Sequence, residues 1–346
     1  MAASVRVGII GATGYGGGEL VRLLARHPGA EVVGLQARGR SDEPIDVSHP
    51  HLAETRLRIG DELPDGLDAV FLGLPHGAAA ALVPDLIAKD LTVVDLGPDF
   101  RLRAAPDYPR WYGFEHPQPD LLERAVYGLP ELHREQLAGL RDADIRIVAS
   151  PGCYATASIL ALAPLARAGL LGDVVVDAKS GVSGAGREAK PEMHFSEVNE
   201  SVKAYGVDGH RHVAEIEQEL GLEAGARLQP IDFLPHLIPM TRGILAACHV
   251  RTTRPVEQPE LDDLFGRAYG GERFVEVVAT PPATKQVTGS NMYRVHAHHD
   301  ARTGRVLVLG VLDNLVKGAA GQAIQAFNVV FGLPESSGLE QLALAP

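Results

Sequence analysis

Short apolar runs recur along the first 150 residues, and stretches with helical spacing separate them. Runs of this kind are typical of parallel strands buried on both faces, and the stretches between them are typical of helices that cover a sheet. The alternation predicts an α/β domain built on a parallel sheet. The predicted strands are residues 5–10, 31–37, 68–74, 91–96 and 145–149, and the predicted helices are residues 19–26 and 78–89.

After about residue 170 the pattern changes, because strand-like runs follow one another with few helical interruptions. This pattern of successive strand-like runs favours an α+β domain with a mixed, largely antiparallel sheet. We therefore predict a first domain at residues 1–152 and a second at 153–316, with a C-terminal helix at about 317–346 packing back on the first. The predicted strands of the second domain are 174–180, 227–233, 244–251, 274–278, 292–299 and 306–312, and its helices are 155–168, 212–220 and 259–269.

A segment rich in proline and aromatic residues, at 97–129, interrupts the first domain. We expect it to be a long excursion on the ligand side of the sheet rather than a linker. Ligands of open α/β sheets bind at the carboxyl ends of the strands, so we expect the functional groups of this domain there.

Composition narrows the class of protein. The chain has 346 residues, 45% of them hydrophobic, which is enough to bury a large core and predicts two domains. Its net charge of −12 opposes binding to nucleic acid, and no apolar run is long enough to suggest a membrane span. Two cysteines, Cys153 and Cys248, and the lack of a leader pattern favour the cytoplasm. We expect a small-molecule ligand.

A glycine-rich turn follows the first predicted strand and precedes the first predicted helix. Glycines let the backbone approach a pyrophosphate closely, and a helix N-terminus supplies N–H donors to meet its charge. The spacing of the glycines departs from G-x-G-x-x-G, so the setting between strand and helix carries the prediction, and a plain tight turn is the alternative. The predicted dinucleotide-binding residues are Gly11, Thr13, Gly14, Tyr15 and Gly16.

The second predicted strand ends in Arg38-Gly39-Arg40-Ser41, where a site for NAD would carry an acidic residue. Arg38 and Ser41 suit a 2′-phosphate, which predicts NADP as the cofactor, although a solvated loop would have the same composition. Two further loops, at Pro75-His76 and Ser183-Gly184, are suited to close approach of a ligand, and we expect them to complete the cofactor site.

Cys153 lies in Ser150-Pro151-Gly152-Cys153, where an apolar run ends and a helical pattern begins. Proline and glycine break the strand, and the first turn of the following helix directs unpaired N–H groups and the positive dipole end toward the sulfur. Such a setting favours the thiolate and predicts a nucleophile. A structural cysteine that fills a corner is the alternative.

Five motifs lie along the chain, at residues 11–16, 150–156, 209–212, 235–243 and 313–322. Taken together and in this order, they resemble the N-acetyl-gamma-glutamyl-phosphate reductase family over nearly the whole chain. The resemblance implies NADPH-dependent reduction of an acyl phosphate to a semialdehyde, with release of phosphate, as a step of arginine biosynthesis. It also implies the fold of aspartate-semialdehyde dehydrogenase, a Rossmann-type NADP-binding domain and a catalytic and oligomerisation domain, hence a homodimer or homotetramer.

The resemblance assigns roles to several residues. Cys153 would form a thioester with the acyl group, and His210 would be the acid/base, with His212 as the competitor for that role or as a nicotinamide contact. Because Asp208 to His212 precedes a predicted helix, the alternative is that one histidine only caps or packs against that helix.

The substrate is an anion entering an acidic protein, so arginines are needed to bind it. The resemblance assigns Arg101 to the substrate phosphate, and the planar guanidinium suits that task. Arg211 and Arg242 are candidates for the substrate carboxylate. Ser150 is a further candidate, but it departs from the asparagine usual in the family, which puts its role in doubt. The resemblance also predicts that Asn314 binds the nicotinamide carboxamide.

Two alternatives stay open. A related reductase of lysine biosynthesis would act on carrier-protein-linked aminoadipyl phosphate, although Tyr154 and residues 235–243 favour the arginine pathway. A non-catalytic NADP-binding sensor would need an unreactive Cys153. His296 and His298 share one face of a predicted strand, but no further ligand lies at a zinc spacing, so we predict no metal and a solvent-facing or subunit-contact surface there.

Overall fold

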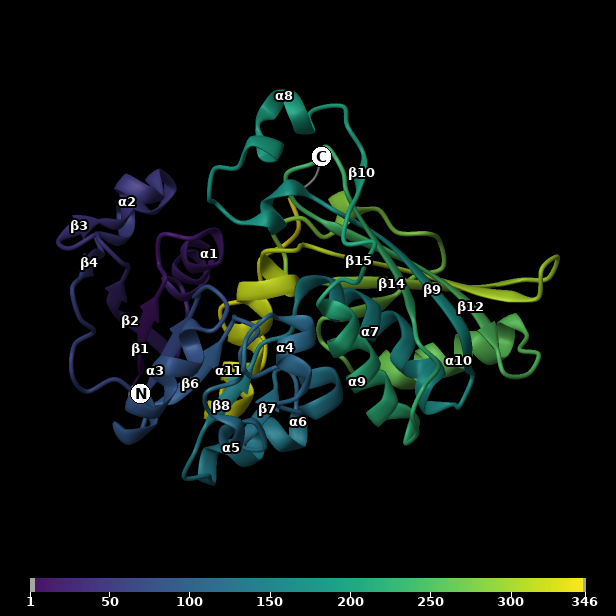
Figure 1. The fold of residues 1–346 in the computed structure, drawn as a ribbon, viewed down its shortest axis with the longest axis horizontal. Coiled ribbons are helices and arrows are strands. Elements are labelled where there is room, and N and C mark those ends of the chain that lie inside the picture. Colours follow the sequence, from purple (N-terminus) through teal and green to yellow (C-terminus); the bar gives the residue numbers. More distant parts are fainter. Residues whose placement is uncertain (1–3, 345–346) are drawn as a thin grey trace. The chain divides into compact units, whose positions relative to one another are not determined.

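The structure is a computed structural model that describes residues 4–344. Contacts divide this part of the chain into two units. The first holds residues 4–151 and Ala319–Gln341, and the second holds Gly152–Gly318 and residues 342–344. Figure 1 shows the chain coloured from the purple N-terminus to the yellow helix near the C-terminus.

The sheet of the first unit has eight strands within the described residues, in the order β3-β4-β2-β1-β5-β6-β8-β7. All neighbouring strands are parallel except β3 and β4. The five strands predicted from apolar runs are all present, whereas β3, β4 and β7 are only two or three residues long and carry no such run. The strands are β1 (Val5–Ile10), β2 (Ala30–Gln36), β3 (Glu43–Pro44), β4 (Arg58–Gly60), β5 (Ala69–Leu72), β6 (Thr92–Asp95), β7 (Ala125–Tyr127) and β8 (Ile147–Ala149).

Helices from the beginning and from the end of the chain pack against this sheet. Helix α1 contacts β1 and β2, α3 contacts β6, and α11, the yellow helix of Figure 1, contacts β6, β8, α1 and α6. Because α11 is buried on nearly every side, it is a core helix of the first unit. The helices are α1 (Tyr15–Leu24), α2 (Ile45–Ser48), α3 (Ala78–Ala88), α4 (Asp107–Trp111), α5 (Pro119–Leu122), α6 (Pro130–Gly139) and α11 (Gly321–Phe331), with 3-10 turns at Pro50–Thr55 and Leu140–Asp142.

Helix α1 begins at Tyr15, four residues before the predicted start, so three glycines lie inside it. The reason is close packing. A Cβ on Gly17 would lie 2.3 Å from the Gly11 carbonyl oxygen, so the helix can approach the preceding turn only without a side chain there. The predicted excursion at 97–129 likewise contains α4, α5 and β7, which are too short to give a periodic pattern.

The second unit contains a seven-stranded sheet in the order β10-β11-β9-β12-β15-β14-β13, counted within residues 152–344. Pairs β11–β9 and β13–β14 are parallel and the others are antiparallel, which confirms the predicted mixed, largely antiparallel sheet. The strands are β9 (Leu171–Ser180), β10 (Lys203–Ala204), β11 (Asp232–Leu237), β12 (Ile244–Thr252), β13 (Val275–Val277), β14 (Tyr293–Asp300) and β15 (Arg305–Leu312).

Strand β11 lies about five residues later than the predicted strand at 227–233. Its register is set by β9, because Asp232 pairs with Val175 and Leu237 with Ser180, so the partner strand rather than the local apolar run fixes its bounds. Figure 1 shows α7, α9 and α10 beside this sheet. The helices of this unit within the described residues are α7 (Cys153–Arg167), α8 (Phe195–Val198), α9 (His212–Ala224) and α10 (Gln258–Tyr269), with 3-10 turns at Val182–Ala185, Pro191–Met193 and Thr284–Gln286 and a π-helix at Val316–Ala320.

The two faces of the second sheet differ. Helix α7 contacts β9, β12 and β15, and the Tyr293 hydroxyl donates to the α7 carbonyl of Ala157 at 2.8 Å, so the buried face is the one toward α7. On β15, Val306 and Val308 are buried, whereas Leu307 and Leu309 alternate with them and stay half-buried. The opposite face therefore leaves apolar side chains partly uncovered.

Candidate active site

Cys153 is the first residue of α7, and the extended backbone of Gly152 (φ −67°, ψ 148°) precedes it as the N-cap. The N–H of Gly152 donates to Glu215 Oε2 of α9 at 2.9 Å. A Cβ on Gly152 would lie 2.4 Å from His212 Nε2, and a Cβ on Gly318 would lie 2.8 Å from the Cβ of Cys153. Two glycines and a buried carboxylate therefore fix the thiol at the start of the helix.

The rings around His210 form a cluster within the second unit. Its ring centroid lies 4.7 Å from that of His212, 5.4 Å from Phe233, 5.6 Å from Tyr154 and 5.7 Å from Tyr205. Tyr154 is the residue after Cys153, so the fold brings the predicted acid/base to the neighbour of the predicted nucleophile.

Two tyrosine hydroxyls connect this cluster. Tyr205 donates to the Tyr154 hydroxyl at 3.1 Å, and Tyr154 donates to the His236 carbonyl at 3.2 Å. Burial raises the pKa of Tyr205 to about 12, to which negative charge on Cys153 also contributes. Burial raises the pKa of Tyr154 as well, so both hydroxyls stay protonated and serve as hydrogen-bond donors.

Burial, with a smaller effect of the Arg211 charge, lowers the pKa of His210 to about 4. Its ring is therefore neutral near pH 7. The N–H of His212 approaches His210 Nδ1 at 3.2 Å, and a ring nitrogen that accepts a hydrogen bond carries no proton. The neutral ring thus holds its proton on Nε2.

His212 differs from His210 in its surroundings. Only 6% of it is exposed, its ring covers Gly152, and its Nε2 lies 3.9 Å from Glu215 Oε1. Packing and an acidic neighbour therefore hold His212, which suits it to a positioning role.

The glycine-rich turn of the first unit follows β1. Gly11 has a φ of +90°, and a Cβ there would lie 2.2 Å from the Gly73 carbonyl oxygen, so only glycine fits. Its N–H and that of Ala12 donate to the Gln36 carbonyl. Gly14 is the N-cap of α1 and Tyr15 is 41% exposed. The turn thus presents backbone at the carboxyl end of β1, as the sequence predicts, together with Thr13 and Gly16.

After β2 the two arginines have different surroundings. Arg40 binds Glu43 at 2.9 and 3.1 Å. Arg38 and Ser41 are exposed, and within residues 4–344 the Arg38 guanidinium has no hydrogen-bond or ion-pair partner. Arg38 is therefore the arginine that is open to an anionic ligand.

Arg101 lies at the carboxyl ends of β6 and β8 and is 8% exposed. Its Nε donates to the Ser150 carbonyl at 2.8 Å and its Nη2 to the Leu96 carbonyl at 2.7 Å, so two strand ends orient the guanidinium. Ser150 is buried, and its Oγ has no hydrogen-bond partner in the described part of the chain. Burial and the Asp99 charge raise the pKa of Asp95, at the end of β6, to about 7.

Asn314 connects two loops of the second unit. Its Oδ1 accepts from the Gly243 N–H at 2.7 Å and its Nδ2 donates to Ser183 Oγ at 2.9 Å. Gly184 beside it is exposed. Arg242 Nη1 lies 3.6 Å from Asp313 Oδ2. The structure thus brings the predicted Ser183-Gly184 loop, Asn314 and the segment that carries Arg242 together.

The remaining predicted residues lie on exposed loops. Arg211 is exposed just before α9, and its positive charge adds to the effect of burial in lowering the pKa of His210. Pro75 and His76 are exposed after β5, where the His76 ring meets Tyr112 edge to face at 5.9 Å.

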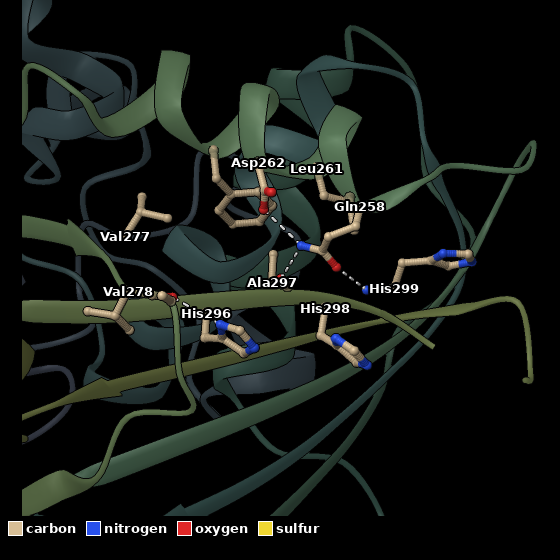
Figure 2. Close-up of a pocket in the computed structure, with 11 residues that line it drawn as sticks. Gln258, Leu261, Asp262, Val277, Val278, His296, Ala297, His298 and His299 are labelled. Atoms are coloured by element: carbon tan, nitrogen blue, oxygen red, sulfur yellow. Dashed lines mark hydrogen bonds between the residues drawn. The ribbon is translucent and has the colours of Figure 1, made fainter. Parts of the chain in front are cut away.

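A cavity of about 390 Å³ lies between α10 and the strands β13 and β14. Figure 2 shows His296 and His298 pointing to the same side of β14, while Gln258 of α10 spans to the Ala297 carbonyl and the His299 N–H. The two rings stack at 6.2 Å, and His296 Nδ1 is within 2.9 Å of the Val278 carbonyl. One ring nitrogen of the pair is therefore already used by the backbone.

Sequence reasoning missed Tyr205, Glu215 and Gly318. Tyr205 lies in a segment without periodicity, and Glu215 occupies an ordinary polar position of the predicted helix 212–220. Only Gly318, inside a helical pattern, gave a signal, because an isolated glycine in a helix marks close packing.

Among residues 4–344, no helix combines the length and the apolar character that a membrane span requires.

Two family models match the chain: "Semialdehyde dehydrogenase, NAD binding domain" over residues 6–140 and "Semialdehyde dehydrogenase, dimerisation domain" over residues 153–314. Among solved structures, aspartate semialdehyde dehydrogenase II of Vibrio cholerae, complexed with ASA, superposes with a TM-score of 0.71 at 17% identity, covering 96% of this chain and 99% of that one. The enzyme of Candida albicans with NADP also gives 0.71, at 15% identity, covering 95% and 99%. At these identities the likeness shows the fold alone.

Curated relatives share far more of the sequence. N-acetyl-gamma-glutamyl-phosphate reductase of Symbiobacterium thermophilum is 52% identical over 97% of both chains. The proteins of that name from Heliobacterium modesticaldum and Dehalococcoides mccartyi are 48% and 44% identical, each covering 99% of this chain and 100% and 99% of their own lengths. The chain belongs to the N-acetyl-gamma-glutamyl-phosphate reductase family and has the two-domain fold of the semialdehyde dehydrogenases.

Proposed function

We propose that the protein reduces N-acetyl-gamma-glutamyl phosphate to N-acetyl-glutamate 5-semialdehyde with NADPH, releasing phosphate, in arginine biosynthesis. The names of its curated relatives support this reaction. The observation that carries it is the position of Cys153, which is held at the N-terminus of α7 by Gly152 and Gly318, beside the rings around His210.

The first step is acyl transfer to the protein. The helix N-terminus favours the thiolate of Cys153, which attacks the acyl carbon. A C–S bond forms, the C–O bond to phosphate breaks, and inorganic phosphate leaves with the bonding electron pair, so a thioester remains. Because the acyl group is then covalently fixed, the following step is a reaction within one complex.

NADPH, when bound, supplies the hydride that reduces the thioester carbon. The resulting thiohemiacetal collapses, the C–S bond breaks, and the thiolate of Cys153 returns as the aldehyde leaves. The Nε2–H of His210 can donate to the thiohemiacetal oxygen, and in the reverse direction the same N–H stabilises the oxyanion that forms when the thiolate of Cys153 attacks the aldehyde. We assign His212 a positioning role because it is packed on Gly152.

The residues of the first unit fit NADP. Gly11 lets the turn pack closely on the Gly73 carbonyl, the N-terminus of α1 that follows can meet a pyrophosphate, and the exposed Arg38 can meet the 2′-phosphate. We propose that Gly11, Thr13, Gly14, Tyr15, Gly16, Ser41, Pro75 and His76 complete this site, with Ser183, Gly184 and Asn314 serving the nicotinamide end.

We propose that Arg101 binds the substrate phosphate, since two backbone carbonyls orient its guanidinium. Arg211 and Arg242 remain the candidates for the substrate carboxylate. Arg211 is exposed beside His210, whereas Arg242 faces Asp313. Ser150 is buried, and so we assign it no more than a backbone contribution through its carbonyl.

We further propose that residues 1–152 with the C-terminal helix bind NADP and that 153–316 carry catalysis and self-association. The description of the matching family model as a dimerisation domain supports an oligomer, for which we propose a homodimer or homotetramer. We place the protein in the cytoplasm, where NADPH and free thiols are maintained.

The test is the reverse assay, in which purified protein oxidises the semialdehyde and reduces NADP⁺ only when inorganic phosphate is present. Activity that persists in Cys153→Ala would exclude covalent catalysis at this residue. Steady-state kinetics with carrier-protein-linked aminoadipyl phosphate addresses the lysine-pathway alternative, which the curated relatives do not favour. A protein that binds NADP⁺ but reduces none of it would instead support a sensor.

A further inference from the structure

Asp99 is a fully buried carboxylate with no place in the reaction described above. Its Oδ1 accepts a hydrogen bond from the Gly77 N–H at 2.8 Å, and its Oδ2 accepts one from the Ala80 N–H at 2.9 Å. Gly77 is the N-cap of α3 and supplies no capping side chain of its own. Asp99, 22 positions after Gly77, therefore supplies the capping that α3 lacks locally.

The segment that Asp99 holds lies beside the dinucleotide turn. It leaves β5 at Gly73, whose N–H donates to the Ile10 carbonyl at 2.8 Å and whose own carbonyl lies beneath Gly11. Since β5 is the neighbour of β1 in the sheet, residues 75–77 and the turn after β1 share its carboxyl edge. That edge is where open α/β sheets bind their ligands.

Asp99 is itself held firmly. Its carbonyl accepts from His116 Nε2 at 2.7 Å, and the buried Tyr108 hydroxyl accepts from the Leu102 N–H at 3.1 Å. Two residues after Asp99, the Arg101 side chain anchors to the ends of β6 and β8. The carboxylate is therefore presented from a rigid turn to an exposed loop.

We propose that Asp99 is a positioning residue for the cofactor, because its carboxylate fixes the shape in which residues 75–77 meet the bound nucleotide. This inference rests on the proposed function. Both carboxylate oxygens are used, so asparagine cannot replace aspartate: its amide nitrogen would face one of the two N–H donors and leave that donor unsatisfied.

The experiment compares Asp99→Asn with the wild-type protein and with Glu131→Gln. Glu131 is a matched control, because it is a buried carboxylate of the same unit that accepts a hydrogen bond from Gln325 on α11. Isothermal calorimetry measures the Kd of NADP⁺, and the reverse assay measures KM for NADP⁺ and for the semialdehyde separately. Hydrogen exchange follows the amides of Gly77 and Ala80.

We expect Asp99→Asn to weaken NADP⁺ binding about tenfold, to leave KM for the semialdehyde within about twofold, and to speed exchange at Gly77 and Ala80. Glu131→Gln should lower thermal stability without changing the Kd. A merely structural role of Asp99 would give the pattern of Glu131→Gln and would overturn the inference.

Gly77→Ala provides a second variant if Asp99→Asn does not fold. Gly77 has a φ of +79°, so alanine strains the loop while the carboxylate stays in place. The same weakening of NADP⁺ binding is expected, and unchanged binding would contradict the inference. If the wild-type protein binds no NADP⁺ at all, the proposed function fails first. If the wild type binds and the variants bind equally well, only the inference fails.

Discussion

At the scale of single residues, the account depends on how backbone and rings confine Cys153 and His210. Two positions beside Cys153 accept no side chain without a close contact, one against the His212 ring and one against the Cys153 Cβ. His210 is surrounded by four rings and loses its charge to burial. The nucleophile is thus fixed in place, and the proposed acid/base is neutral at working pH.

Burial of His210 predicts an unusual pH dependence. Protonation of the His210 ring at Nδ1 would remove the acceptor of the His212 N–H and displace the ring, so kcat/KM for semialdehyde oxidation should stay free of a histidine limb down to about pH 5 and fall as the pH approaches 4. His210→Gln should lower kcat by roughly 10²–10⁴-fold and remove this limb. An acidic limb near the ordinary histidine value of about 6.5, lost in His210→Gln, would show that burial does not act as described.

Gly318→Ala should disturb Cys153 directly, because the added Cβ would lie 2.8 Å from the Cβ of the cysteine. We expect kcat to fall by about tenfold or more, since small displacements of a nucleophile are costly. Gly266→Ala on α10 is the matched control, because nothing lies within 4 Å of a Cβ there. Equal activity of the two variants in the reverse assay would contradict the packing argument.

At the scale of elements, long periodic segments were predictable and short ones were not. The five apolar strands of the first sheet and the helix after Cys153 follow from local pattern, because burial on both faces leaves a continuous apolar run. The predicted bounds of β11 were wrong because pairing with β9, rather than the local apolar run, decides where this strand begins and ends. The predicted start of α1 was too late because helical propensity disfavours glycine. The helix nevertheless includes three glycines, since only a residue without a side chain can pack against Gly11.

The residues of the candidate site also divide into those that a local sequence pattern marks and those that only distant contacts reveal. Cys153, Gly11 and Arg38 are marked by their position at the end of a strand or the start of a helix, so the sequence points to them. Tyr205, Glu215 and Asp99 act through contacts with residues 51, 63 and 22 positions away, which no local pattern reports. These residues therefore required the structure.

The loop after β2 predicts cofactor preference. Arg38→Ala should raise KM for NADPH by roughly 10–100-fold, the range expected when one charge-assisted hydrogen bond is lost, and should leave KM for NADH nearly unchanged. Arg40→Ala is the control, because Arg40 is already paired with Glu43. If Arg40→Ala gives the larger effect in parallel assays with both cofactors, the assignment of Arg38 is wrong.

At the scale of the whole molecule, the described residues divide into two units, and the proposed reaction assigns NADP binding to the first and catalysis to the second. The family model for the second unit describes a dimerisation domain, and the face of its sheet opposite α7 leaves Leu307 and Leu309 partly exposed. An apolar sheet face in water favours association with a second surface. We therefore expect copies of the chain to associate through this face.

Leu307→Asp should shift the protein toward the monomer, because a charge on that face would be buried without a partner in the assembly. Sedimentation velocity over a range of concentrations measures the change. Leu222→Asp, at a 45% exposed position of α9, is the matched control and should leave the oligomer intact. An unchanged oligomer in Leu307→Asp would place the interface elsewhere.

The central claim is that the acyl group passes through a covalent bond to Cys153. The most direct measurement is mass spectrometry of the protein mixed with N-acetyl-gamma-glutamyl phosphate in the absence of NADPH and quenched in acid. The account predicts an N-acetylglutamyl adduct on the peptide that contains Cys153, formed together with released phosphate and absent from Cys153→Ala. Turnover of the same preparation without any adduct on that peptide would contradict the account.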